Sequence, residues 1–263
     1  MTYGFIGLGN MASAIIGGMR KSSAYEKAEI YGFNRSEGKT LAAKDALGVI
    51  PCSCAAEVCE KADVTVLCVK PQMLPEVLDE IRGAAAGKTV VSVAAGKTVA
   101  YYEENLPGAH VVRTMPNLAA KICSGVTALC FGSGVTGEEK REAESIFETV
   151  GATCVIEEKY FSAFSALGGA SAAFACLYID ALAKAGVRAG LPRDISLKVA
   201  AQATEGACRL VSDTGEHPAS IADSVCSPGG TTIEGVMELR RLGFENAVHA
   251  AVDAVIKKDE ALR

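Results

Sequence analysis

The sequence contains no tryptophan and only three histidines, His110, His217 and His249, which stand far apart along the chain. Its ten cysteines include no Cys-x-x-Cys pair, the spacing typical of structural zinc sites. Lysine and arginine never form a run longer than two residues, and the net charge is −5. Because nucleic-acid binding needs a basic surface, we expect neither a metal site nor a nucleic-acid partner.

Long, strongly hydrophobic segments are also lacking. Residues 1–19 carry no charge, but glycines and Asn10 interrupt them, and no basic region precedes them. Residues 160–179, YFSAFSALGGASAAFACLYI, are uncharged but rich in Ala, Ser and Gly, and Asp180 follows directly. Close helix approach is possible along the small residues Gly168, Gly169, Ala172 and Ala173. We therefore predict a helix buried against a partner chain and no membrane span.

The sequence environment of the cysteines indicates the cellular compartment of the protein. Several lie within apolar runs, as Cys68 does in VTVLCVK, and in such a setting cysteine behaves as a small hydrophobic residue. Disulfides are rare in the reducing cytosol. Free and mostly buried thiols therefore predict a cytoplasmic protein.

The first half of the chain alternates apolar, β-branched runs with helical patterns. The expected strands are TYGFIG, AEIYGFN, DVTVLCV, TVVSVAAG, HVVRTMPN and GVTALCFG. This alternation predicts an α/β fold with a doubly wound parallel sheet. The last helix of this half is expected to begin at Thr136 and to end at Gly151.

After about residue 158 the strand pattern disappears. The expected helices are FSALGGASAAFACLYIDALAKAGV, RDISLKVAAQATEGACRLV, PASIADSV and TIEGVMELRRLGFENAVHAAVDAVIKKDEAL. A change from β/α alternation to an all-helical pattern predicts two domains, residues 1–157 and residues 158–263.

A glycine-rich turn, Gly7-Leu8-Gly9-Asn10-Met11-Ala12, joins the first expected strand to the first expected helix. It matches the dinucleotide-binding fingerprint, with alanine as the third small residue. Gly7 permits the tight turn, Gly9 lets a pyrophosphate approach the backbone, and Ala12 lets the helix pack on the sheet. Residues 7–11 are therefore predicted to bind a dinucleotide, which makes residues 1–157 a Rossmann-type NAD(P)-binding domain.

The second expected strand ends in Asn34-Arg35-Ser36, where an NAD enzyme usually has an acidic residue. A guanidinium group pairs bidentately with phosphate oxygens, so this end favours the 2′-phosphate of NADPH. Alternatively, Arg35 is a solvated residue at the start of a helix and Glu37 takes the acidic role, which would allow NADH.

Small and polar residues follow the other strands of the expected sheet. They are Val69-Lys70-Pro71-Gln72, Ala94-Ala95-Gly96 and Met115-Pro116-Asn117. Ligands of open α/β sheets bind beyond the carboxyl ends of the strands, so we expect these residues to line one crevice. The small residues at 94–96 would leave room for a nicotinamide ribose.

The stretch SPGGTTIEGVMEL, Ser227 to Leu239, is predicted to be a turn followed by a helix. Its small residues leave backbone N–H groups bare at a helix N-terminus, where the helix dipole favours an anion. The turn either caps the helix only or binds a negatively charged group.

These segments resemble pyrroline-5-carboxylate reductase over essentially the whole chain and in the same order. The resemblance rests on GFIGLGNMA, VKPQ, SVAAG, RTMPN, AGVRAGLPR and HPASIADSVCSPGGTTIEGV, of which SPGGTT is highly specific to the family. It implies a Rossmann domain and then a helical domain that interlocks with a second chain, so that the protein is a homodimer or a higher homo-oligomer. It also implies NAD(P)H-dependent reduction of a cyclic imine acid to L-proline.

The resemblance further implies roles for individual residues. Ser224 stands where the family often has an asparagine facing the nicotinamide, and it would keep a weaker hydrogen bond. Thr232 would place a catalytic hydroxyl near the ring nitrogen, although a helix N-cap is the alternative role for it. The substrate carboxylate would bind Gly229, Gly230, Thr231 and Thr232.

This sequence departs from the family in two places. Residues 168–174, GGASAAF, stand where the family has SGSGPAY, and Ala55 stands where an asparagine often contacts the adenosine ribose. Two other functions stay open. One is an oxidoreductase like the β-hydroxyacid dehydrogenases, whose lysine on the long helix has no counterpart between Lys159 and Lys184. The other is a non-catalytic, nucleotide-binding regulatory paralogue.

Overall fold

The structure, a computed structural model, describes residues 1–261. The chain forms two compact units. The first contains Met1–Gly169 and the C-terminal segment that starts at Ile256, and the second contains Ala170–Val255. By its packing the segment from Glu158 to Gly169 belongs with the first unit, whereas the sequence pattern assigned it to the helical part. The domain boundary between residues 157 and 158 stays a prediction.

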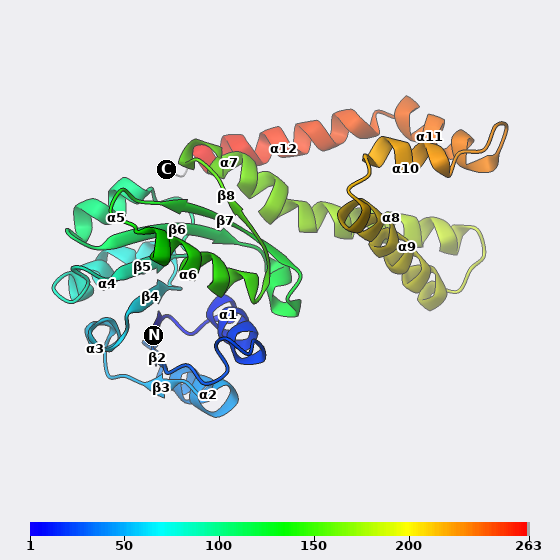
Figure 1. The fold of residues 1–263 in the computed structure, drawn as a ribbon. Helices are drawn as coiled ribbons and strands as arrows, with labels where there is room; N and C mark the ends of the chain where they lie inside the picture. Colours follow the sequence, from blue (N-terminus) through cyan, green and yellow to red (C-terminus); the bar gives the residue numbers. More distant parts are fainter. Residues whose placement is uncertain (262–263) are drawn as a thin grey trace. The chain divides into compact units, whose positions relative to one another are not determined.

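The first unit is built on an eight-stranded sheet with the order β3-β2-β1-β4-β5-β6-β7-β8 (Figure 1). Strands β1 to β6 are parallel, so the predicted doubly wound α/β fold is confirmed. Strand β7 runs antiparallel to β6, and β8 runs parallel to β7. The strands are β1 (Tyr3–Ile6), β2 (Ile30–Phe33), β3 (Ile50–Pro51), β4 (Val64–Leu67), β5 (Thr89–Ser92), β6 (His110–Pro116), β7 (Gly125–Phe131) and β8 (Gly151–Val155).

The antiparallel strand has a simple cause. Only residues 117–124 connect β6 to β7, and a parallel crossover needs a dozen or more residues. Strands β3 and β8 were not predicted. Both residues of β3 are exposed, and most of β8 is exposed or half-buried, so neither strand shows the apolar run of a central strand.

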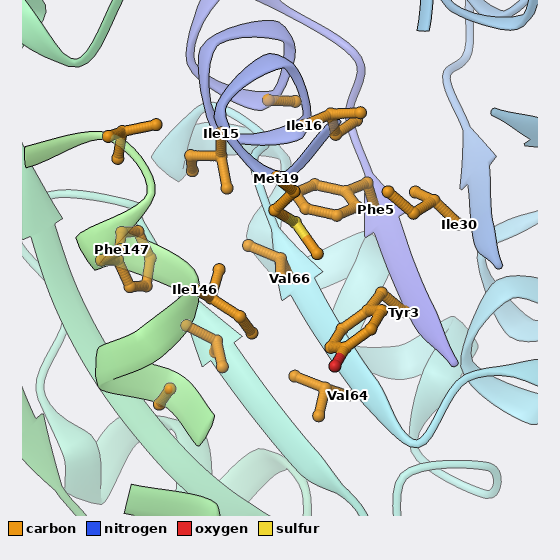
Figure 2. Packing of buried hydrophobic residues seen from close by; sticks show 14 of the residues in the cluster. Tyr3, Phe5, Ile15, Ile16, Met19, Ile30, Val64, Val66, Ile146 and Phe147 are labelled. Carbon is orange, nitrogen blue, oxygen red and sulfur yellow. The ribbon is translucent and has the colours of Figure 1, made fainter. Parts of the chain in front are cut away.

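Helices cover both faces of the sheet. One face is covered by α1 (Asn10–Lys21), α2 (Glu37–Leu47) and α6 (Gly137–Glu148), and the other by α3 (Ala55–Lys61), α4 (Leu74–Ile81) and α5 (Val99–Asn105). Figure 2 shows the first face, where side chains of α1 and α6 meet those of the central strands. Each fully buried side chain there contributes about 1.5–3 kcal/mol. This core holds in place the carboxyl ends of the strands, next to which the predicted cofactor-binding residues lie.

Helix α6 begins as predicted, with Thr136 as its N-cap in a reciprocal capping box with Glu139. Its predicted end is wrong, because the helix stops at Glu148. Gly151 instead starts β8, where it packs directly on the backbone of Gly125 and leaves no room for a Cβ atom.

A helical run follows β8. It passes through η3 (Glu158–Tyr160), α7 (Phe161–Phe164) and a π-helical turn, η4 (Ser165–Ala170), into α8 (Ser171–Arg188). The amide of Asn117 donates a 2.8 Å hydrogen bond to the Gly168 carbonyl oxygen in the π-helical turn. The stretch Glu158–Arg188 is long and apolar enough to cross a membrane, and little of it is buried within the single chain.

The second unit is helical, as predicted. It contains α8, α9 (Arg193–Thr214), α10 (Pro218–Ser224), α11 (Thr231–Arg241) and most of α12 (Phe244–Glu260). The last predicted helix is in fact two, because the chain turns at Gly243, whose φ is +77°. Many large apolar side chains of this unit are exposed in the single chain, among them Leu177, Leu182, Leu197, Val199, Leu210, Met237 and Leu242.

A pH-dependent contribution to stability follows from Glu139. Its carboxylate accepts hydrogen bonds from the Thr89 hydroxyl at 2.9 Å and from the Thr136 amide at 2.7 Å, and lies 2.6 Å from His110 Nδ1. Burial opposes ionisation, but these hydrogen bonds prevail and lower the pKa of Glu139 from 4.5 to about 2. A lowered folded-state pKa stabilises the protein above pH 4.5, and this contribution is lost as the pH falls towards 2.

We therefore expect Glu139→Gln to lower the free energy of unfolding by about 1–3 kcal/mol at pH 6. The difference from the unmodified protein should shrink as urea unfolding is repeated down to pH 3. Glu138→Gln, in the same helical turn, is the control and should show no such trend. A difference that stays constant over this pH range would contradict the assignment.

Candidate active site

The glycine-rich turn has the backbone geometry that its sequence predicted. Gly7 has a φ of +91°, and a Cβ atom there would lie 2.7 Å from the Cys68 carbonyl oxygen. Gly9 is the N-cap of α1 in an extended conformation, and a Cβ atom there would have no neighbour within 4 Å. Gly7 is thus required by the fold, whereas Gly9 keeps the space in front of α1 open.

The start of α1 offers unoccupied backbone donors. No side chain caps this helix, and its first turn has no acidic residue. The amide of Leu8 is already used, because it donates to Asn34 Oδ1 at 3.1 Å. The amides of Asn10 and Met11, in the first turn of the helix, are therefore the ones that face an incoming anion. This cradle fits the pyrophosphate of a dinucleotide.

The end of β2 is held against this turn. Besides accepting from Leu8, Asn34 donates from Nδ2 to the Ser36 carbonyl oxygen at 3.3 Å. Arg35 forms an ion pair with Glu76 of α4, and both side chains are mostly exposed. A cleft of about 120 Å³ lies here, lined by Gly7, Asn34, Arg35, Val69, Glu76 and Glu80, among others. An adjoining cleft of about 320 Å³ is lined by Asn34, Arg35 and Glu37, together with residues 51–53 at the end of β3.

A third cleft, of about 330 Å³, lies at the ends of β4 and β5. It is lined by Pro71, Gln72, Ala95, Gly96, Lys97 and Asp259. Lys70 immediately precedes η1 (Pro71–Met73). Asp259 comes from the C-terminal end of α12 and accepts a 2.7 Å hydrogen bond from the Ser162 hydroxyl. Sequence reasoning missed Lys97 and Asp259, and Asp259 had no local signal because it is far away in the sequence.

A buried network supports the loop of residues 94–96. The Ala94 amide donates to Ser92 Oγ at 3.2 Å, and that oxygen lies 2.6 Å from the hydroxyl of Tyr102. Nearby, the buried Arg113 donates to Glu158 at 2.9 Å and lies over the ring of Phe161. Asn117, which was expected to line the crevice, is engaged instead in hydrogen bonds to Val126 and Gly168.

The second unit carries the other predicted site residues. Ser227 to Gly230 form a tight turn, in which the Gly230 amide donates to the Ser227 carbonyl oxygen at 2.9 Å and Gly229 has a φ of +68°. Proline before a glycine of positive φ is typical of a type II turn. The hydroxyl of Ser224 donates to the Ile221 carbonyl oxygen of its own helix at 2.7 Å.

Gly230 is the N-cap of α11, and no side chain caps this helix. The alternative role of Thr232 as N-cap is therefore wrong, because Thr232 is the second residue of the helix. Thr231 and Thr232 are both exposed. The bare first turn of α11 can present amides and hydroxyls to an anion.

The cysteines offer no nucleophile beside the glycine-rich turn. Burial raises the pKa of the Cys68 thiol to about 12, so this thiol stays protonated at neutral pH. All ten cysteines are free, and Cys123, Cys154, Cys176 and Cys208 are exposed in the single chain, which corrects the prediction of mostly buried thiols. Within residues 1–261 no group of three or more His, Cys, Asp or Glu side chains is placed to hold a metal ion.

Comparison with known proteins covers both units. Residues 158–262 match the family model described as pyrroline-5-carboxylate reductase dimerisation, and residues 2–96 match that of coenzyme F420-dependent NADP oxidoreductases. The pyrroline-5-carboxylate reductase of Escherichia coli (strain K12) is 38% identical, over 98% of this chain and 97% of the relative. That of Glycine max is 37% identical, over 99% of this chain and 96% of the relative.

Solved structures agree with these relatives. A pyrroline-5-carboxylate reductase from Coxiella burnetii superposes with a TM-score of 0.95 at 29% identity, covering 99% of this chain and 98% of that one. The pyrroline carboxylate reductase of Plasmodium falciparum, solved with NADP bound, gives a TM-score of 0.88 at 27% identity, covering 100% of this chain and 98% of that one.

The two glycines of the turn should respond differently to substitution. Gly7→Ala should lower the melting temperature, because its positive φ and the nearby Cys68 carbonyl group exclude a side chain. Gly9→Ala should leave the melting temperature nearly unchanged but weaken dinucleotide binding about ten-fold or more, since the methyl group enters the cradle. Thermal unfolding and calorimetric titration measure the two effects. Equal loss of stability in both variants would contradict this division of roles.

Proposed function

This chain belongs to the pyrroline-5-carboxylate reductase family, and we propose that it reduces 1-pyrroline-5-carboxylate to L-proline, the last step of proline synthesis, with a nicotinamide cofactor. The observation that carries the proposal is the likeness to relatives of this activity along nearly the whole chain, including both the glycine-rich turn and the SPGGTT segment. A regulatory paralogue that only binds a nucleotide would need the open start of α1 but would have no reason to keep an uncapped helix start at α11.

The cofactor would be held by residues of the first unit. The first-turn amides of α1, at Asn10 and Met11, would bind the pyrophosphate, and Asn34, Arg35 and Ser36 the adenosine end. Residues 69–71 and 94–96 would flank the nicotinamide end, where small side chains leave room for a ribose. When bound, the reduced nicotinamide supplies a hydride to the carbon of the C=N bond.

The substrate would be held by the start of α11. The amides at Thr231 and Thr232, beside the open backbone of Gly229 and Gly230, would bind its carboxylate, as the helix dipole favours an anion there. The N–H of the protonated imine would donate to the hydroxyl oxygen of Thr232, which fixes the orientation of the C=N bond. A protonated imine is already electrophilic and already carries the nitrogen proton, so positioning the two reactants supplies most of the acceleration and no separate proton donor is needed. Ser224 would lie towards the nicotinamide.

The assembly is proposed to be a homodimer or a higher homo-oligomer. The exposed apolar side chains of the second unit and the match of residues 158–262 to a dimerisation model support this. An apolar surface of this extent is typical of an interface between chains. The same interface, and not lipid, would cover the apolar run Glu158–Arg188. Free thiols throughout the chain support a cytoplasmic location.

The test is oxidation of the reduced cofactor with 1-pyrroline-5-carboxylate, followed at 340 nm with NADPH and again with NADH. We expect turnover, with L-proline as the product identified by mass spectrometry. No turnover with either cofactor would overturn the function and favour the regulatory paralogue.

We propose NADPH as the preferred cofactor because Arg35 stands where NAD enzymes have an acidic residue. NADH would remain usable. Arg35→Asp should raise the Michaelis constant for NADPH much more than that for NADH. The lost charge-assisted hydrogen bond to the phosphate and the added repulsion should together weaken NADPH binding by about 2–4 kcal/mol. Steady-state kinetics with both cofactors measure this. Equal losses with both would show that Arg35 does not bind the phosphate.

The hydroxyl of Thr232 is proposed to act in catalysis. Thr232→Ala should lower kcat/KM about ten- to hundred-fold, equivalent to about 1–3 kcal/mol, while the affinity for NADPH stays nearly unchanged. Thr232→Ser restores the hydroxyl and should recover most of the activity. If Thr232→Ala kept full efficiency and only lowered the melting temperature, the residue would have a structural role alone.

A further inference from the structure

The arginine proposed to select the cofactor already has an anionic partner in the protein. Arg35, at the end of β2, is paired with Glu76, in the first turn of α4, across the cleft that begins at Gly7. The side chain of Arg35 is 64% exposed and that of Glu76 is 67% exposed. This ion pair joins the segment after β2 to the first turn of α4 at the carboxyl edge of the sheet, where the adenosine end of a dinucleotide would bind.

A second carboxylate lines the same cleft but has a different role. Glu80 accepts hydrogen bonds from the backbone amides of Ala55 at 2.7 Å and of Ala56 at 3.3 Å, so it is committed to the start of α3. Within residues 1–261 Glu76 pairs with Arg35 and accepts no hydrogen bond from a backbone amide. Glu76 is therefore the carboxylate whose interaction a ligand phosphate would have to replace.

We propose that Glu76 is a cofactor-specificity residue, whose carboxylate competes with the 2′-phosphate of NADPH for Arg35. This inference rests on the proposed function, since it requires Arg35 to bind that phosphate. NADH has no 2′-phosphate and leaves the ion pair intact. NADPH has to break the pair and then bring its phosphate close to a carboxylate of the same charge. Glu76 thus reduces the preference for NADPH over NADH.

The size of the effect follows from exposure. Ion pairs between exposed side chains contribute little, because water screens the charges and both side chains lose freedom. We therefore expect removal of the Glu76 charge to strengthen binding of a 2′-phosphate about two- to five-fold. The gain should diminish at high salt concentration, since the Debye length is about 10 Å at 0.1 M and about 3 Å at 1 M.

The experiment compares Glu76→Gln with Asp79→Asn. Asp79 lies on the same helix, is 74% exposed and is paired with Arg82 at 3.2 Å, so its substitution removes the same charge without touching Arg35. Isothermal titration calorimetry measures the binding of adenosine 2′,5′-bisphosphate and of adenosine 5′-monophosphate, which differ in the 2′-phosphate. Glu76→Gln should bind the bisphosphate more tightly and the monophosphate unchanged, whereas Asp79→Asn should bind both as the unmodified protein does.

Further measurements distinguish failure of the Glu76 inference from failure of the proposed function. In an Arg35→Ala background, Glu76→Gln should give a smaller gain, because competition for Arg35 is absent and only the direct repulsion between carboxylate and phosphate is relieved. The inference is overturned if Glu76→Gln weakens bisphosphate binding, which would make the carboxylate a support for Arg35, or if both α4 variants behave alike. Absence of turnover with 1-pyrroline-5-carboxylate, or equal losses on Arg35→Asp, would instead count against the proposed function or its cofactor choice.

Discussion

The close approach of Gly7 to the carbonyl group of Cys68 is the constraint on which the rest of the cofactor site depends. A Cβ atom at Gly7 would lie 2.7 Å from that oxygen, and the φ of +91° is one that L side chains rarely adopt. Only glycine therefore lets the chain leave β1 beside the end of β4 and turn into α1. This turn brings the first amides of α1 to the carboxyl edge of the sheet.

The neighbouring loop is fastened to the same turn. The Gly7 amide donates to the Phe33 carbonyl oxygen at 2.8 Å, and the Leu8 amide donates to the side chain of Asn34 at 3.1 Å. The backbone that would bind the pyrophosphate is thus held by hydrogen bonds, whereas the Arg35 side chain is mostly exposed. The amides are proposed to bind the part that all dinucleotides share, and the exposed charge of Arg35, balanced by Glu76, is proposed to distinguish one dinucleotide from another.

Structural features that depend on neighbouring residues could be predicted well from the sequence. The glycine-rich turn from Gly7 to Ala12, the start of α6 at Thr136 and the end of β2 just before Asn34 could all be predicted, because each depends on residues close together in the sequence. Asp259 and Glu76 could not. They reach the clefts from helices remote in sequence, and only the folded sheet brings them there. Strands β3 and β8 were missed for another reason: they are short or exposed and lack the apolar run of a central strand.

The two proposed anion sites share one structural feature, a helix start without a side-chain cap. Helices α1 and α11 both begin at a glycine N-cap, follow a glycine of positive φ, and have no side chain that caps their first turn. Helix α5 also begins at the carboxyl edge of the sheet, but Thr98 accepts a hydrogen bond from the Tyr101 amide and so uses a donor that a ligand would need. A threonine cap uses a first-turn amide for its own side chain, whereas a glycine cap leaves the first-turn amides to a bound anion. The glycine-capped starts of α1 and α11 are where a phosphate and a carboxylate are proposed to bind, and a negatively charged ligand would account for the lack of charge in the SPGGTT turn.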